Sequence, residues 1–165
     1  MTNRTKVTNI VIAGLGGEGV LKASDIIADV AFRAGLDVKK SEVHGMSQRG
    51  GSVASDVRFG ETVYSPMVPP GEADYLVVLS PDQVESNRWR MREGGTLITP
   101  GAVPVNSLRD KRSLNVALLG CLSLSLPFPE AAWTEAIRRN LAEKLHAANL
   151  LAFSVGRTAA KNSLP

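Results

Sequence analysis

Cysteine and histidine are scarce in this 165-residue sequence, which has one cysteine, Cys121, and two histidines, His44 and His146. A single cysteine excludes an internal disulfide, a zinc knuckle and a self-contained iron–sulfur site, because such a cluster takes four thiolates. The two histidines stand far apart, with no acidic or thiol neighbour at a regular spacing, which argues against a metal site. Cys121 lies in the apolar run 118–124, so we expect a buried side chain rather than a reactive thiol.

Long apolar runs and blocks of one charge are also missing. No run reaches the roughly 18 apolar residues that a membrane-spanning helix needs, and residues 1–8 do not lead into the apolar segment of a secretory signal. We therefore expect a cytoplasmic protein without a membrane anchor. Aromatic residues make up 5% of the chain and the net charge is +3, which suits an anionic ligand better than a nucleic acid.

The residues that are present are typical of a folded protein. Hydrophobic residues account for 44% and charged residues for 21% of the sequence, and its length fits one domain of ordinary size. We expect a single domain over 1–165, with an α/β core at 8–100 and C-terminal helices at 113–156.

The N-terminal pattern predicts a βαβ unit. The β-branched run 9–13 is typical of a strand, and small or apolar residues recur at helical spacing over 20–32. Gly35 supplies a helix stop, and 36–43 predicts a second strand that lies parallel to the first through a right-handed crossover.

Further elements follow in alternation. Strands are predicted at 53–59, 62–65, 75–79 and 96–99, with a short helix at 81–92. Gly60 and Glu61 separate the first two of these strands, which predicts an antiparallel hairpin. The expected fold class is therefore α/β, a Rossmann-like three-layer fold with a mixed, mainly parallel sheet and a C-terminal helical segment.

The C-terminal part is predicted to be helical after a loop at 100–112. An apolar helix is expected at 114–126, and Pro127 and Pro129 break the chain after it. One long helix is then predicted over 130–153. Its apolar positions recur every four residues, as a core-facing stripe requires, at Trp133, Ile137, Leu141 and Leu145.

The first candidate site is the glycine turn between the first strand and the first helix. It has the pattern G-x-G-G-x-G, formed by Gly14, Gly16, Gly17 and Gly19. Such glycines let a phosphate approach bare backbone N–H groups at the positive end of a helix dipole. The structural alternative is that they only allow the strand and helix to pack closely. Glu18 argues against an ordinary dinucleotide site, since it places a carboxylate in the turn.

A ribose-binding acid is not clear at the end of the second strand. Glu42 is the one good candidate, and the adjacent Lys39 and Lys40 indicate a phosphorylated ribose instead. Neighbouring strand residues face opposite sides, so one of the two lysines is expected to be solvated.

The second candidate site is the polar loop after that strand, with Ser47, Gln48, Arg49, Gly50 and Gly51. The glycines let backbone N–H groups converge, and the arginine offers a planar fork of donors, so the loop suits a phosphate or a carboxylate. No nucleophile with a base at fixed spacing is present, so no catalytic residue is predicted.

These segments together resemble a known family. GLGGEGV at 14–20 and EVHGMSQRGGSV at 42–53 are followed by VRFG at 57–60, SPMVPPGEADYLVVL at 65–79 and GGTLI at 94–98. The sequences and the order of these motifs resemble those of the gamma-type subunit of the 2-oxoacid:ferredoxin oxidoreductases. The resemblance is greatest to the small subunit of the enzymes that act on indolepyruvate.

The resemblance implies a subunit of an enzyme that oxidatively decarboxylates indolepyruvate or another aryl 2-oxoacid. The acyl group then joins coenzyme A and electrons pass to ferredoxin. Thiamine diphosphate and the iron–sulfur clusters would belong to the large catalytic subunit. This chain would dock on that partner and help shape the coenzyme A side, holding no firmly bound cofactor and remaining inactive alone. The glycine turn and the 47–51 loop would face ligand or partner. A homodimer is an alternative state of the isolated chain.

Three departures from the family leave other interpretations open. Glu18 stands where Gln is common, Ser80 stands where Glu is common, and the stretch 101–112 is shorter than usual. Glu18 and the short stretch favour a non-catalytic assembly partner of the same fold. Lys39 and Lys40 favour a stand-alone reductase that binds NADP or a flavin.

Overall fold

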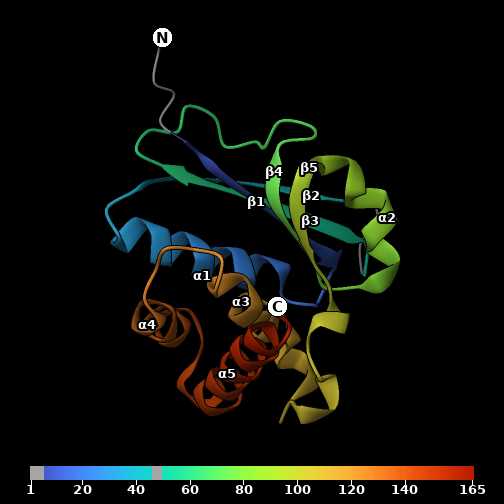
Figure 1. Ribbon diagram of the computed structural model, residues 1–165, viewed down its shortest axis with the longest axis vertical. Coiled ribbons are helices and arrows are strands. Elements are labelled where there is room, and N and C mark those ends of the chain that lie inside the picture. Colours follow the sequence, from blue (N-terminus) through green and yellow to red (C-terminus); the bar gives the residue numbers. More distant parts are fainter. Residues whose placement is uncertain (1–5, 46–49) are drawn as a thin grey trace.

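The computed structural model describes residues 6–45 and 50–165, which form one sheet with most of its helices on one face (Figure 1). The strands are β1 (Thr8–Leu15), β2 (Asp37–His44), β3 (Ser52–Gly60), β4 (Ala73–Val78) and β5 (Met91–Ile98). The helices are α1 (Val20–Arg33), α2 (Val84–Asn87), α3 (Leu114–Ser123), α4 (Glu130–Asn140) and α5 (His146–Asn162). Short 3-10 turns occupy 81–83, 88–90, 100–102, 105–107, 111–113 and 143–145.

The sheet has the strand order β2-β3-β1-β4-β5. β1 pairs in parallel with β4 and β4 with β5, whereas β3 is antiparallel to both of its neighbours. Four strands therefore run in one direction and β3 alone is reversed. This arrangement, with the helices and the C-terminal helical segment, confirms the predicted α/β fold with a mixed, mainly parallel sheet.

The predicted parallel direction of β1 and β2 is confirmed, although the two strands are not paired with each other. β2 does run in the direction of β1, but β3 lies between them and pairs with both along its length. Strands that follow each other closely in sequence pair readily, so β2 joins β3, which comes only eight residues after it ends. The periodicity of a single strand carries no information about this choice.

The predicted hairpin of 53–59 with 62–65 is wrong. Both edges of β3 are already paired, so no edge remains for another strand, and residues 61–72 form a connecting loop. The helix predicted at 81–92 is shorter as well, since 3-10 turns flank α2 and β5 begins at Met91.

That loop covers the sheet face opposite the main helices. Asp56 of β3 accepts the Val68 N–H at 2.9 Å and pairs with Arg90 at 2.7 Å, which fixes the loop and the 88–90 turn over this face. Val68 and Val84 complete a small apolar cluster there. The buried strand residues of this cluster are Val11, Ala13, Ala73, Leu76 and Val78.

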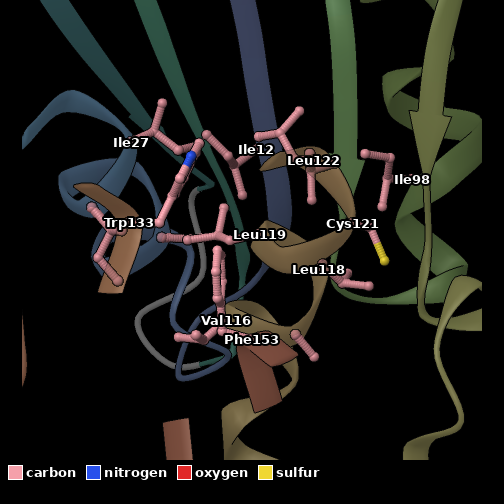
Figure 2. Packing of buried hydrophobic residues seen from close by; sticks show 14 of the residues in the cluster. Ile12, Ile27, Ile98, Val116, Leu118, Leu119, Cys121, Leu122, Trp133 and Phe153 are labelled. Carbon is pink, nitrogen blue, oxygen red and sulfur yellow. The ribbon is translucent and has the colours of Figure 1, made fainter. Parts of the chain in front are cut away.

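The larger core lies between the sheet and helices α1, α3, α4 and α5. Alternate residues of β1, such as Ile10 and Ile12, lie in this core, and their neighbours lie in the small cluster. Both faces of the strand are therefore buried, which explains its continuous apolar sequence. Every residue of α3 from 115 to 123 is buried. Figure 2 shows Leu119 and Leu122 of this helix near Ile12 of the sheet. No helix in the ranges described above is both long and apolar enough to cross a membrane.

The long helix predicted over 130–153 is instead two helices. Leu141 and Ala142 have extended backbone angles, and the chain resumes as α5 after a 3-10 turn. Trp133 and Ile137 are buried as the stripe predicts, and Leu141 is partly buried against the same core. The spacing of four continues across the break, so the pattern alone could not reveal that the chain changes direction.

The helices α3 and α5 cross at very close range. A Cβ at Gly156 would overlap the carbonyl oxygen of Ala117, and a Cβ at Gly120 would overlap that of Phe153. At the same crossing the Cys121 thiol contacts the Gly156 carbonyl oxygen at 3.4 Å. The two glycines therefore allow contact between the two helix backbones.

Asp29 connects α1 to α4. It accepts from Arg139 at 2.9 Å, from Asn140 at 2.9 Å and from Arg33 of its own helix at 3.0 Å. Burial raises the pKa of the Asp29 carboxyl, but these hydrogen bonds and the Arg139 charge outweigh burial and hold the pKa below its usual value. The carboxylate therefore stays ionised and bonded at neutral pH.

We expect Gly156→Ala to lower the free energy of unfolding by roughly 1–3 kcal/mol or more, because the added methyl group must force the helices apart. Urea unfolding followed by circular dichroism measures the change. Gly101→Ala is the matched control, since its nearest contact would be the Thr99 hydroxyl at an ordinary 3.7 Å. Equal unfolding midpoints for the two variants would contradict the close crossing.

Candidate functional site

The glycine turn, residues 14–19, connects β1 to α1 as the sequence predicts. Gly17 and Gly19 have φ angles of +90° and +85°, in the left-handed region that residues with a Cβ rarely adopt. Gly19 is also the N-cap of α1. The backbone conformation therefore requires glycine at two of the four positions.

Close contacts explain other glycines of the turn. A Cβ at Gly14 would lie 2.6 Å from a carboxylate oxygen of Glu18, and a Cβ at Gly16 would lie 3.4 Å from the nitrogen of Gly50. A Cβ at Gly19 would overlap the side-chain amide of Asn115, which donates to the Gly19 carbonyl oxygen at 3.1 Å. The structural role that the sequence left open for these glycines is thus present in the fold.

Several N–H groups of the turn have partners within the chain, including that of Glu18, which donates to the Leu15 carbonyl oxygen at 3.2 Å. Leu15 N–H donates to Glu18 Oε2 at 2.7 Å, and Gly16 N–H donates to the Gly51 carbonyl oxygen at 2.8 Å. A carboxylate therefore already lies against the amide where an anion would bind. A diphosphate at the Leu15 amide would be repelled by the negative charge of Glu18. This part of the turn therefore suits a neutral part of a ligand better than a phosphate.

The second candidate loop meets the first at these bonds. The Gly16–Gly51 bond brings the two predicted segments together, and Gly45 N–H donates to the Ser52 carbonyl oxygen at 2.6 Å, closing the base of the loop. Gly50 has a φ of +64°, so it too requires glycine. Ser47, Gln48 and Arg49, together with Met46, lie outside the described residues.

A cavity of about 370 Å³, which we call the turn cavity, opens beside the glycine turn. Its lining is mostly apolar, with Lys22 and His44 as its basic side chains. His44 Nε2 lies 3.9 Å from Glu42, and its side chain is more than half exposed. The end of β2 therefore contributes His44 to the same hollow as the turn.

The residues predicted to bind a ribose are engaged elsewhere. Lys40 pairs with Asp25 of α1 and lies 3.7 Å from Glu42, while Lys39 pairs with Asp37 at 3.4 Å. The strand that carries them is also separated from β1 by β3. The arrangement of a dinucleotide site, with the acid on the strand next to the glycine turn, is therefore not formed.

Cys121 is buried, as the sequence predicts. Burial raises the pKa of its thiol to about 11, so the group is protonated at neutral pH. Among the residues described by the structure, no three His, Cys, Asp or Glu side chains come together as a metal-binding group.

Sequence reasoning missed residues that α3 and the segment before it bring to the turn. A cavity of about 270 Å³, which we call the Glu18 cavity, adjoins the turn cavity at Gly17, which lines both. Its lining includes Glu18, Asn115, Lys111 and Arg112. Asn115 follows Gly19 by 96 residues, so no local pattern could connect them. The one signal was a pair of cations shortly before an apolar helix.

Comparison with known proteins defines the class. Residues 9–159 match the pyruvate ferredoxin/flavodoxin oxidoreductase family, and the chain belongs to this family. The match spans both candidate loops and the C-terminal helices.

Particular relatives narrow the class further. The chain is 36% identical to indolepyruvate oxidoreductase subunit IorB of Thermococcus kodakarensis, over 96% of this chain and 98% of the relative. It is 35% identical to the subunit of the same name from Pyrococcus horikoshii, with the same coverage. Both alignments run over more than 200 positions, although this chain has 165 residues, so both relatives contain residues without a counterpart here.

Solved structures share the fold. The keto/oxoacid ferredoxin oxidoreductase gamma subunit of Geobacter sulfurreducens has a TM-score of 0.79 at 21% identity, covering 94% of this chain and 99% of that one. The 2-oxoglutarate:ferredoxin oxidoreductase of Magnetococcus marinus, solved with 2-oxoglutarate, coenzyme A and succinyl-CoA, has a TM-score of 0.85 at 24% identity. The superposition covers 98% of this chain and 32% of the Magnetococcus chain.

We expect Glu18→Ala to lower the free energy of unfolding by about 1 kcal/mol, because the Leu15 N–H loses its acceptor. Glu18→Gln keeps an acceptor oxygen and removes the charge, so its loss is expected to be less than half as large. Urea unfolding of both variants tests the bond. Equal losses in the two variants would show that the carboxylate charge, and not the hydrogen bond, stabilises the turn.

Proposed function

We propose that this chain is the small subunit of a 2-oxoacid:ferredoxin oxidoreductase that acts on indolepyruvate or another aryl pyruvate. The observation that carries the proposal is the end-to-end similarity to indolepyruvate oxidoreductase subunits, in a chain whose two candidate loops meet at the Gly16–Gly51 bond. The glycine turn and the 47–51 loop are among the motifs that carry the family resemblance.

In the proposed reaction, the 2-oxoacid and coenzyme A give carbon dioxide and an acyl-CoA, and two electrons pass to ferredoxin. Thiamine diphosphate and iron–sulfur clusters on the large catalytic subunit would supply the decarboxylation and electron-transfer chemistry. The single cysteine of this chain is consistent with that division, because an iron–sulfur cluster takes four thiolates. No catalytic residue is assigned to this chain.

The proposed contribution of this chain is to dock on the catalytic subunit and shape the coenzyme A side of the site. The turn glycines Gly14, Gly16, Gly17 and Gly19, with Ser47, Gln48, Arg49, Gly50 and Gly51, would form the facing surface. The turn cavity beside them is mostly apolar and suits an uncharged arm of the ligand. Met67, an exposed apolar residue, is a further candidate contact with the partner.

A stand-alone reductase using NADP or a flavin is the less favoured alternative. Lys39, Lys40 and Glu42 form ion pairs on or near their own strand, and Glu18 places a carboxylate at the turn amide. The cations that favoured a phosphorylated ribose therefore have other partners.

A specific observation favours a second candidate, an assembly partner that has lost ligand binding. The Glu18 carboxylate already accepts the hydrogen bond of the Leu15 N–H, and the chain is shorter than its relatives. In that case the subunit would stabilise the complex without contacting coenzyme A.

Co-expression with the large subunit from the same genome separates these candidates. We expect a purified complex that reduces a viologen dye with indolepyruvate only when coenzyme A is added. A complex that forms but stays inactive would favour the assembly role. Tight binding of NADPH by the isolated chain, without complex formation, would overturn the proposal.

Arg49→Ala provides a test of the loop within that complex. If the guanidinium holds an anion, kcat/KM for coenzyme A should fall by a factor equivalent to about 2–4 kcal/mol, because a charged hydrogen-bond partner is lost. Arg138→Ala, at an exposed position of α4, is the control. A drop in subunit affinity with unchanged KM would assign Arg49 to docking, and unchanged values of both would remove it from the site.

A further inference from the structure

A third cavity, which we call the basic cavity, has a volume of about 630 Å³ and lies between the segment before α3 and the beginning of α5. Its volume is in the range of pockets that hold small molecules, roughly 300–1,000 Å³. It is lined by Arg109, Asp110, Lys111, Arg112, Lys144, Leu145, Ala147 and Ala148. Four of these eight residues are cationic and one is acidic.

The positive charge of this cavity is largely uncompensated. Arg112 donates to both carboxylate oxygens of Asp110, at 3.0–3.2 Å, so this pair is nearly neutral. Arg109, Lys111 and Lys144 form no ion pair with any residue in the described ranges. Most other cations of the described chain do have acidic partners. Arg109, Lys111 and Lys144 are exposed, so solvent screens their repulsion in part, and an anion bound in the hollow would reduce it further.

The beginning of α5 adds to the side chains. Ala147 and Ala148 line the cavity and belong to the first turn of α5, a helix of 17 residues that continues from the 3-10 turn at 143–145. The N-terminal end of a helix dipole is positive and favours an anion. The cavity thus places side-chain cations beside the positive end of a long helix.

The basic cavity also continues toward the candidate site. Lys111 and Arg112 line both the basic cavity and the Glu18 cavity, and Gly17 lines both the Glu18 cavity and the turn cavity. The three hollows therefore adjoin in a row. An elongated ligand can have its charged end in the basic cavity and its neutral end at the glycine turn.

We propose that the basic cavity binds the phosphate groups of a nucleotide-class ligand, through Arg109, Lys111 and Lys144. The identification of that ligand as the nucleotide end of coenzyme A rests on the proposed function. The carboxylate of Glu18 lines the middle cavity of the row and not the basic cavity, so this arrangement places the phosphates and the carboxylate in different hollows. It also assigns the phosphate-binding role to residues outside the glycine turn.

Isothermal titration calorimetry on the full chain tests the proposal. The probes are adenosine 3′,5′-bisphosphate, coenzyme A, inorganic phosphate and pantetheine. The double variant Lys111→Gln/Lys144→Gln removes two cations of the cavity. Its control, Arg138→Gln/Lys161→Gln, removes two exposed cations of α4 and α5 that also lack an ion pair in the described chain, so both variants change the net charge equally.

We expect the cavity variant to weaken binding of the bisphosphate and of coenzyme A at least tenfold, and the control to change it less than twofold. Equal weakening by both variants would show that the loss of binding comes from the change in net charge, and it would overturn the proposal. So would unchanged binding in the cavity variant, or a wild-type chain that binds no bisphosphate. Inorganic phosphate binding as tightly as the bisphosphate would overturn the nucleotide assignment.

The same variants in the complex with the large subunit separate this inference from the proposed function. An active complex in which the cavity variant leaves the KM for coenzyme A unchanged overturns the inference and leaves the proposed function standing. The opposite result has two parts: the isolated chain binds the bisphosphate through the cavity, and the complex shows no 2-oxoacid activity. It would overturn the proposed function and leave phosphate binding by the cavity standing. A cavity variant that loses only subunit affinity would assign these cations to docking.

Discussion

The burial of α3 determines how the sheet and the C-terminal helices pack together. This helix is apolar on all sides, so it must be enclosed by the sheet on one side and by α5 on another. Gly120 and Gly156 permit the second contact, because a Cβ at either position would overlap a backbone carbonyl oxygen. The same helix begins beside the glycine turn, where Asn115 fills the space next to Gly19. Core packing and the geometry of the candidate site are therefore fixed by one element.

Local signals predicted the fold well wherever the structure is local. The strand, glycine turn and helix from β1 to α1 have the predicted order, and α1 ends before Gly35, whose φ is +87°. The positions of β2 and of residues 62–65 were not predictable in this way, because they depend on which strand edges are already paired. The break at Leu141 was hidden for a different reason, since the apolar spacing continues across it.

The candidate site was predictable to a similar extent. Glycines in a strand–turn–helix context identified the turn, and the Gly16–Gly51 bond places Gly51 of the second candidate loop beside it. The hydrogen bond from the Leu15 N–H to Glu18 is visible only in the three-dimensional structure. The sequence showed only that a carboxylate is unusual at this position of a phosphate-binding turn. Lys111, Arg112 and Lys144 could not be grouped from the sequence, because the fold brings two distant segments around one cavity.

The protonated thiol of Cys121 has a practical consequence for handling this protein. Burial raises the pKa of this thiol to about 11, so it is protonated at neutral pH, and the sulfur lies buried where α3 meets α5. Alkylating reagents and mild oxidants should therefore leave the native chain untouched. They should react once the two helices separate, so the lone sulfur can serve as a built-in reporter of opening in that part of the molecule.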